Sequence, residues 1–361
     1  MSHLRFLRDF AAGRYLDLML VAAVTTVILI RFFLVLTGYP QLGGAGLHIA
    51  HVLWGGLLML AALVVAISFV GRRPQWLVAI LGGAGFGAFI DEVGKFVTQD
   101  HDYFYQPAVS LIYVALIMLY LAIRSLHRER TARRPEYVAN AIQDVLEIAM
   151  GDLDRQERTR ALHYLERAGG SSALVRGLRG ILDDATLVPE APPGRWAQLG
   201  QRLVSGYQRI TGTFWFGRAL IAFFVVQLLL KLGRLLALTH LLPPAHERWL
   251  TVPIASSLPT DAGHFDLVHW LQLAFSLLSG VFVAWGVVLV FRDRLRALSM
   301  FQRSILVALF LTQVFVFYRV EWLGLGELLF NLLVLWALRF MIVRERATRT
   351  SVPAKRTGGG R

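Results

Sequence analysis

Long apolar runs, separated by short polar or basic segments, recur along the whole chain. A run of about eighteen apolar residues is long enough to cross a bilayer as a helix. We therefore predict an all-α fold, a polytopic membrane helix bundle with eight spans. Their approximate bounds are 15–37, 47–70, 75–97, 107–124, 214–239, 264–291, 303–318 and 325–343.

The second group of four spans repeats the first in outline. In each group the first span carries a basic residue near its far end, and histidines stand at the head of the second span. Basic stops follow the second and fourth spans of each group. This shared order predicts a parallel duplication of two related four-span halves, 1–128 and 214–346. The tail, 347–361, is predicted to be disordered.

The segment between the halves, 129–213, has the composition of a soluble helical domain with an amphipathic linker. Pro135 can open one helix, Asp154 and Glu157 form a capping-box pattern, and Ser172 can cap a third helix. The first helix has apolar residues at helical spacing, namely Val138, Ile142, Val145, Leu146 and Ile148. The last piece, 195–210, is amphipathic and basic, and it either lies on the inner membrane surface or packs on the small domain.

Composition supports a membrane protein and explains the charge. Hydrophobic residues make up 56% of the chain, the mean hydropathy is +0.54 and the net charge is +13. Such basicity would suggest nucleic acid in a soluble protein, but here the arginines cluster in alternate loops, as the positive-inside rule requires. We therefore expect no nucleic-acid partner, a bacterial cytoplasmic (inner) membrane location, cytoplasmic N- and C-termini, and an uncleaved first span.

Cysteine is absent from the chain. Disulfides, thiolate metal sites, iron–sulfur clusters and covalently attached haem are thereby excluded.

Charged residues inside the third span are the main candidates for function. Asp91 and Glu92 lie about 22 Å along a helix that crosses a core of about 30 Å, because each residue adds about 1.5 Å. His48 and His51 enter the second span from the same side, at a similar depth. Charges at such depth usually face a protein interior or a water-filled cavity. We take Asp91 and Glu92 as candidate catalytic residues.

Glycines offer a way to bring these groups together. Gly55 shares one helix face with His48 and His51, and Gly83, Gly87 and Gly94 line one stripe of the third span. Small residues permit close helix contact in membranes. We expect these two glycine faces to pack together, so that the histidines approach the acids.

The imidazoles and carboxylates suit zinc or another divalent metal ion. Candidate metal ligands are His48, His51 and His101, with Lys95, Asp102 and Tyr103 as supporting groups. Two alternatives stay open. Asp91 and Lys95 can form an i, i+4 ion pair within a polar packing network, with Lys95 reaching the interface, or the acids can line a transport route.

The second half keeps polar residues at the head of its second span, His264, Asp266 and His269. It has Thr312 and Gln313 where the alignment puts the two acids, so any chemistry should be asymmetric and based in the first half. Supporting or ligand-binding groups would be Arg31, Asp266, His269, Arg319, Glu327 and Asn331.

The basic residues of the spans, Arg31, Lys231, Arg234 and Arg319, each fit snorkelling taken alone. As a set they could form a positive outer vestibule for a phosphate or carboxylate headgroup. A haem held between His51 and His269 has few supporting features.

The run GFGAFIDEVGKF (85–96) with DYFYQP (102–107) resembles an uncharacterised family of bacterial multi-span membrane proteins. The resemblance covers chiefly the first four spans and implies no activity. Walker, HExxH and GxSxG sequences are absent, and the paired glycines lie within a span, where packing explains them better than nucleotide binding.

Three functions remain open. The first, which we prefer, is an outward-facing polar site that binds a metal ion or an anionic lipid or lipid-linked ligand, with or without catalysis. The second is an ion- or proton-coupled transporter. The third is a membrane-anchored sensor or assembly factor that binds a protein partner at 135–190. Membrane lipids are partners in each.

Overall fold

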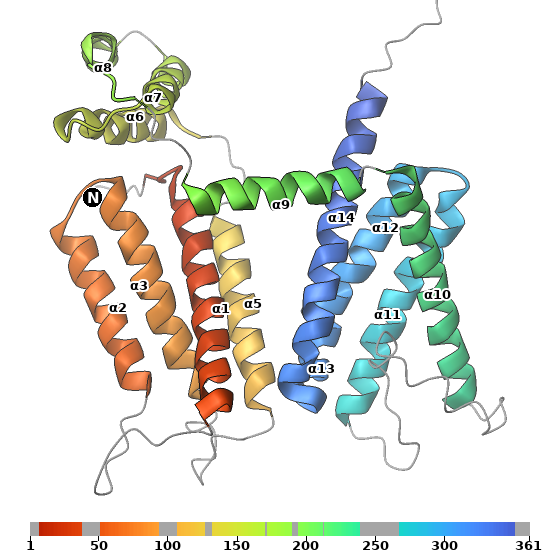
Figure 1. Ribbon diagram of the computed structural model, residues 1–361. Helices are drawn as coiled ribbons and strands as arrows, with labels where there is room; N and C mark the ends of the chain where they lie inside the picture. The colour runs from red at the N-terminus through yellow and green to blue at the C-terminus, as the bar shows by residue number, and fades with distance from the viewer. Residues whose placement is uncertain are drawn as a thin grey trace, which may run out of the picture. The chain divides into compact units, whose positions relative to one another are not determined.

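The computed structural model describes residues 7–37, 51–93, 107–126, 132–169, 172–189, 194–211, 213–238 and 267–350 (Figure 1). Those residues are helical wherever they have regular structure, and they include no strand. Within them, six helical runs are long and apolar enough to cross a membrane, which indicates a multi-pass membrane protein. They are Ala12–Thr37, His51–Ser68, Ala108–Ser125, Trp215–Gly233, Trp270–Val290 and Arg294–Ala347.

The predicted count of eight spans is not confirmed. The glycine-rich third span forms helix α3 (Arg72–Asp91), which begins with two arginines, ends in an aspartate and is not among the six. The last two predicted spans lie within one long helical run, 294–347. The chain turns within that run at the 3₁₀ segment η4 (Glu321–Gly324), where Glu321 has a φ of 47°.

The chain divides into two compact units, 1–105 with 115–192, and 106–114 with 193–361. Helix α5 (Ala108–Leu126) contributes residues to both. In the first unit, α3 packs along both α1 (Ala12–Thr37) and α2 (His51–Ser68) and lies between them (Figure 1).

Glycines of α3 make these close contacts, but with partners other than those predicted. A Cβ atom on Gly83 or Gly87 would collide with the backbone carbonyls of Met19 and Ala23 in α1. The face toward α2 is instead that of Gly85, where an added Cβ would lie 2.7 Å from the carbonyl oxygen of Gly55. The predicted contact of the Gly83 stripe with Gly55 is wrong, because α3 has neighbours on two sides and uses a different glycine for each.

Helices α6 (Arg134–Ala149), α7 (Arg155–Ala168) and α8 (Ala173–Asp184) form a small domain of the first unit with its own apolar core. The predicted starts are confirmed: Pro135 lies in the first turn of α6, Asp154 and Glu157 form a capping box, and the Ser172 hydroxyl accepts from Val175 N–H. Of the predicted apolar positions, Val138, Val145 and Ile148 pack on this core, whereas Ile142 is exposed and Leu146 lines a cavity.

The second unit contains α10 (Phe214–Leu238), α11 (Leu267–Val290), α12 (Arg294–Val307), the π-helical segment η3 (Ala308–Thr312), α13 (Gln313–Val320) and α14 (Leu325–Thr350). Their apolar core is centred on the stacked rings of Phe224 and Phe301, 4.4 Å apart. Two predicted bounds are wrong. Asp293 caps α12, so the helix begins at Arg294, before the span predicted to start at 303, and α14 continues to Thr350, past the predicted span end at 343.

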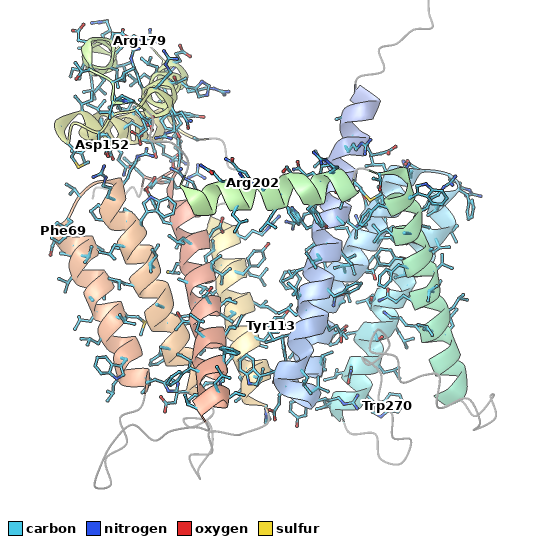
Figure 2. All side chains as sticks on the ribbon, viewed as in Figure 1. Phe69, Tyr113, Asp152, Arg179, Arg202 and Trp270 are labelled. Atoms are coloured by element: carbon cyan, nitrogen blue, oxygen red, sulfur yellow. The ribbon has the colours of Figure 1, made fainter. Side chains whose placement is uncertain are left out.

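The amphipathic segment forms α9 (Arg195–Thr211), which runs across α14 within the second unit (Figure 1). Tyr207 anchors it, with its ring stacked 4.0 Å from that of Trp336 and its hydroxyl donating to the Leu333 carbonyl at 2.8 Å. Leu199 and Leu203 remain exposed, and Arg202 is labelled on this helix in Figure 2. An amphipathic helix with exposed apolar residues and arginines suits a membrane surface.

Candidate functional site

A buried ion pair joins α1 to the end of α3. The Nε atom of Arg31 donates to a carboxylate oxygen of Asp91 at 2.6 Å, and a second guanidinium nitrogen donates to the Asp91 carbonyl at 2.9 Å. Asp91 is 0% exposed, and the Arg31 side chain is 11% exposed. Arg31 therefore does not snorkel; it neutralises Asp91 and also satisfies one of the terminal carbonyls that α3 leaves unpaired.

His51 of α2 lies between the two acids. Its Nε2 atom is 3.2 Å from the second carboxylate oxygen of Asp91, and its Nδ1 atom is 3.7 Å from Glu92. The same Glu92 oxygen accepts a hydrogen bond from the Val52 backbone N–H at 2.9 Å. Glu92 therefore contacts α2 through both a side chain and a backbone N–H.

Arg31, His51, Asp91 and Glu92 form one compact cluster of charged and ionisable side chains. With a neutral imidazole, Arg31, His51, Asp91 and Glu92 carry a net charge of −1, and with a protonated imidazole the net charge is zero. Asp91 faces the Arg31 guanidinium in both states, whereas Glu92 has a positive side chain beside it only when the imidazole is protonated. Histidine is also the side-chain type that changes charge near neutral pH. The geometry therefore suits reversible protonation.

The same geometry disfavours a metal ion at Asp91. Its carboxylate already binds a guanidinium, and a divalent cation there would have to displace Arg31 or lie beside its positive charge. Within the described residues no group of three or more histidines and acids could hold a metal ion. The candidate ligands His48 and His101 lie outside those residues.

The remaining predicted site residues divide into two sets. Lys95, Asp102, Tyr103 and Asp266 lie outside the described residues, as does the predicted ion pair of Asp91 with Lys95; for His269 only the backbone, in α11, is described. Arg319, Glu327 and Asn331 belong to the second unit, where Glu327 and Asn331 line a cavity of about 290 Å³.

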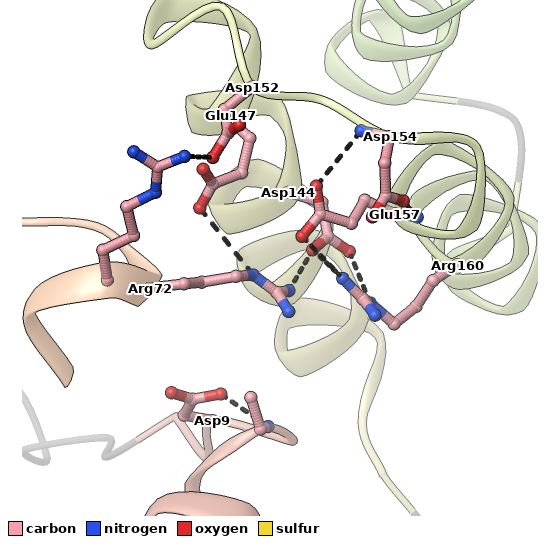
Figure 3. Close-up of polar contacts among 10 residues, drawn as sticks. Asp9, Arg72, Asp144, Glu147, Asp152, Asp154, Glu157 and Arg160 are labelled. Carbon is pink, nitrogen blue, oxygen red and sulfur yellow. Dashed lines mark hydrogen bonds and ion pairs between the residues drawn. The ribbon is translucent and has the colours of Figure 1, made fainter. Parts of the chain in front are cut away.

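A second charged cluster lies where α6 meets α3 (Figure 3). Asp144 is fully buried and accepts hydrogen bonds from Arg72 at the start of α3 and from Arg160 of α7, the latter at 3.0 Å. Glu147 lies 4.0 Å from Arg72, and Arg73 donates to Asp152 at 2.5 Å. The basic stop predicted from topology is therefore also a docking point for the small domain.

The N-terminal segment docks on the same face of α6. Arg8 donates to both carboxylate oxygens of Glu136, at 3.0 and 3.2 Å, and Asn140 accepts from Phe10 N–H at 2.7 Å while donating to the Arg8 carbonyl. Sequence reasoning missed this surface. Its signal was a row of polar residues at spacings of four, four and three, namely Glu136, Asn140, Asp144 and Glu147.

Charge and burial set the protonation of this row. The hydrogen bond from Arg8, with that from the Arg133 backbone N–H, lowers the pKa of Glu136 to about 2 from its ordinary 4.5. Burial raises the pKa of Asp144 and of Glu147 above their ordinary values, opposed by the nearby arginines. A cavity of about 310 Å³ adjoins the row and is lined by Arg72, Tyr15 and Gln143, among others.

No family model, curated protein or solved structure matches the chain.

Proposed function

We propose that the chain is a multi-pass protein of the bacterial inner membrane that senses protons on the outer side and signals through its cytoplasmic helical domain. In this proposal the termini are cytoplasmic, the membrane part consists of two related four-span halves, and the site at Asp91 and Glu92 faces outward. The positive-inside distribution of arginines supports this orientation.

The observation that carries the proposal is that two helices connect both clusters. Helix α3 holds Asp91 at one end and Arg72, which binds Asp144 of α6, at the other. Helix α1 holds Arg31, and the segment just before it holds Arg8, which binds Glu136. From Arg72 to Asp91 a helix spans about 29 Å at about 1.5 Å per residue. The site and the small domain are thus joined by the continuous helix α3 and by α1 with the segment that precedes it.

Packing leaves little room for α3 to absorb a change at one end. Its glycines touch the backbones of α1 and α2, so any tilt or slide displaces neighbours as well. Proton uptake at His51 would strengthen its attraction to both acids and draw α2 toward the end of α3. Because close-packed helices move as bodies, that shift would reach Arg72 and Arg73 at the other end. The cavity beside α6 gives the domain space to respond.

The small domain also has a surface on which a partner protein could bind. Leu174 and Ile181 are exposed on α8 at i, i+7 spacing. Between them, a Cβ atom added at Gly177 would meet no other atom within 4 Å. An apolar stripe on a charged helical domain suits the groove or helix of a signalling partner. In this proposal the predicted partner surface, 135–190, is centred on α8.

Hydrogen exchange measured by mass spectrometry can test the sensor. The full chain in lipid nanodiscs would be labelled at pH 8.0 and 5.5, with times scaled for intrinsic exchange. We expect protection of α6 to differ between the two values, and His51→Gln and Glu92→Gln to abolish the difference. The matched control, His163→Gln, changes an exposed histidine of the small domain and should retain it.

The His51→Gln variant also identifies titration within the small domain itself. If protection changed with pH equally in His51→Gln, the responding group would be local, such as Glu147, and the sensor would be refuted. Identical protection at both pH values in the unmodified protein would refute it too.

A further inference from the structure

Polar side chains form a continuous row on one face of α11 in the second unit. Gln272, Ser276 and Ser279 are separated by four and three residues, so they share a helix face. All three are at most 2% exposed. Burying a row of polar side chains in a membrane-spanning helix costs free energy unless those side chains contact other polar groups.

The helix opposite supplies a matching row. The hydroxyls of Ser279 and Ser304 of α12 are 2.9 Å apart, which fixes the register of the two helices. They run in opposite directions, so Gln272, seven residues before Ser279, lies level with Thr312, eight residues after Ser304. Helix α11 also packs on η3, and Phe275 stacks on Phe315 at 5.9 Å, in agreement with this register.

We call the contact between the polar row of α11 and the facing residues from Ser304 to Gln313 the seam. Several atoms at this seam have no hydrogen-bond partner in the part of the chain that the structure describes. They are both amide atoms of Gln272, the Thr312 hydroxyl and the Gln313 amide oxygen, and Gln227 of α10 has an unpartnered amide oxygen as well. Each such group costs about 1–3 kcal/mol when buried without a partner. Four residues with this property in one unit indicate that water or a ligand supplies the missing bonds.

The backbone beside the seam is irregular. Residues 308–312 form a π-helical segment, a widening that frequently marks functional sites. Next to it the Gln313 amide donates to the Gly324 carbonyl, and Gly324 lines the cavity of about 290 Å³ together with Gln227 and Glu327. At about 30 Å³ of liquid volume each, that space is large enough for several waters or a small organic ion.

A lysine stands at the inner end of the seam, and an aromatic core closes it. The Nζ atom of Lys231 donates to Ser279 at 3.2 Å. Beyond this level the Phe301 ring lies against Gly286, where an added Cβ would be 2.6 Å from it, and stacks on Phe224. The polar row therefore ends at Lys231 and does not cross the unit.

We propose that this seam is a hydrated blind passage that admits small anions from the N-terminal end of α11 to the ammonium group of Lys231. Amide, hydroxyl and ammonium donors are the groups that bind carboxylates, sulfonates and similar anions. Trp270, labelled in Figure 2, lies near that entrance. The inference is independent of the proton sensor, because it concerns the second unit only.

Single cysteines test the passage directly, because the chain has none. Ser276→Cys would be treated, in the full chain in nanodiscs, with an anionic sulfonate and a cationic trimethylammonium methanethiosulfonate. Rates would be divided by those for a free thiol. We expect the anionic reagent to be favoured about tenfold, since a local positive charge concentrates anions. Leu278 lies on the outer side of the same candidate membrane helix, which in a bilayer would face lipid. Leu278→Cys should therefore react with neither reagent at a comparable rate.

Two charge variants identify the cause. Lys231→Gln in the Ser276→Cys background should remove the anion preference, and Glu327→Gln should increase it, because Glu327 is a negative group of the adjoining cavity. Each variant must elute as a single species and have an unfolding temperature close to that of the unmodified protein.

The proposal is overturned if Ser276→Cys is unreactive while Ser205→Cys, on the exposed surface of α9, reacts. It is equally overturned if the cationic reagent reacts as fast or faster, or if the preference survives loss of Lys231.

Discussion

Replacing Arg31 with glutamine should destabilise the first unit strongly, because Asp91 would keep a buried charge without its guanidinium. Asp91 is completely inaccessible, and the variant removes two hydrogen bonds, at 2.6 and 2.9 Å. Breaking a buried ion pair by removing one partner typically costs about 3–5 kcal/mol. We expect the free energy of unfolding to fall by an amount in that range.

The reciprocal and double variants separate the pair from its surroundings. Asp91→Asn should cost a similar amount, because it leaves the Arg31 charge with little exposure. The double variant removes both charges and leaves neither unopposed. Its cost should therefore fall short of the sum of the single costs by about 2 kcal/mol or more, within the range of coupled neighbours.

Unfolding in mixed micelles of mild detergent and sodium dodecyl sulfate, followed by tryptophan fluorescence, would measure these costs. Arg14→Gln is the matched control, because Arg14 is exposed on the same helix. Its effect should stay within about 0.5 kcal/mol. If the single costs of Arg31→Gln and Asp91→Asn instead add to the cost of the double variant within about 0.5 kcal/mol, the two side chains are not coupled and the site is wrongly assigned.

Two further predictions concern the same unit. Gly55→Ala should cost about 1–3 kcal/mol, because its Cβ would lie 2.7 Å from the Gly85 carbonyl; adjacent Gly56→Ala meets nothing within 4 Å and should be neutral or stabilising by up to about 1 kcal/mol. Equal effects in the same unfolding assay would contradict the packing. With the pKa of Glu136 lowered to about 2, its contribution is complete above about pH 4.5 and is lost as the pH falls toward 2. Between pH 6 and 3 the unfolding temperature should therefore fall more in the unmodified protein than in Glu136→Gln. The exposed control Glu166→Gln should follow the unmodified protein, and the same dependence in Glu136→Gln would disprove this assignment.

Helix starts were predicted correctly from the sequence where they depend only on residues a few positions away. The capping residues Asp154 and Ser172 begin helices as predicted, since a cap needs only backbone groups two or three positions away. The approach of His51 to Asp91 and Glu92 was also predicted, because equal depth in the membrane follows from counting residues along two helices.

Partners across helices could not be deduced in the same way. Depth places Arg31 level with several groups, but only the rotation of α1 about its axis decides that it meets Asp91. The glycine prediction failed for this reason: Gly83 and Gly85 are only two positions apart in the sequence yet face different helices. Likewise, the role of the acids of α6 became visible only when Arg8, Arg72 and Arg160 were found against them.

The sequence by itself determined that this is a helical, multi-pass membrane protein with a small helical domain between its membrane segments. Hydrophobicity decides this, because the transfer of each residue out of water depends on its own side chain and little on its neighbours. Only the tertiary structure decided which charges are paired, which glycines touch, and where polar atoms remain without partners. Those outcomes depend on the rotation and offset of whole helices, which many weak contacts set together.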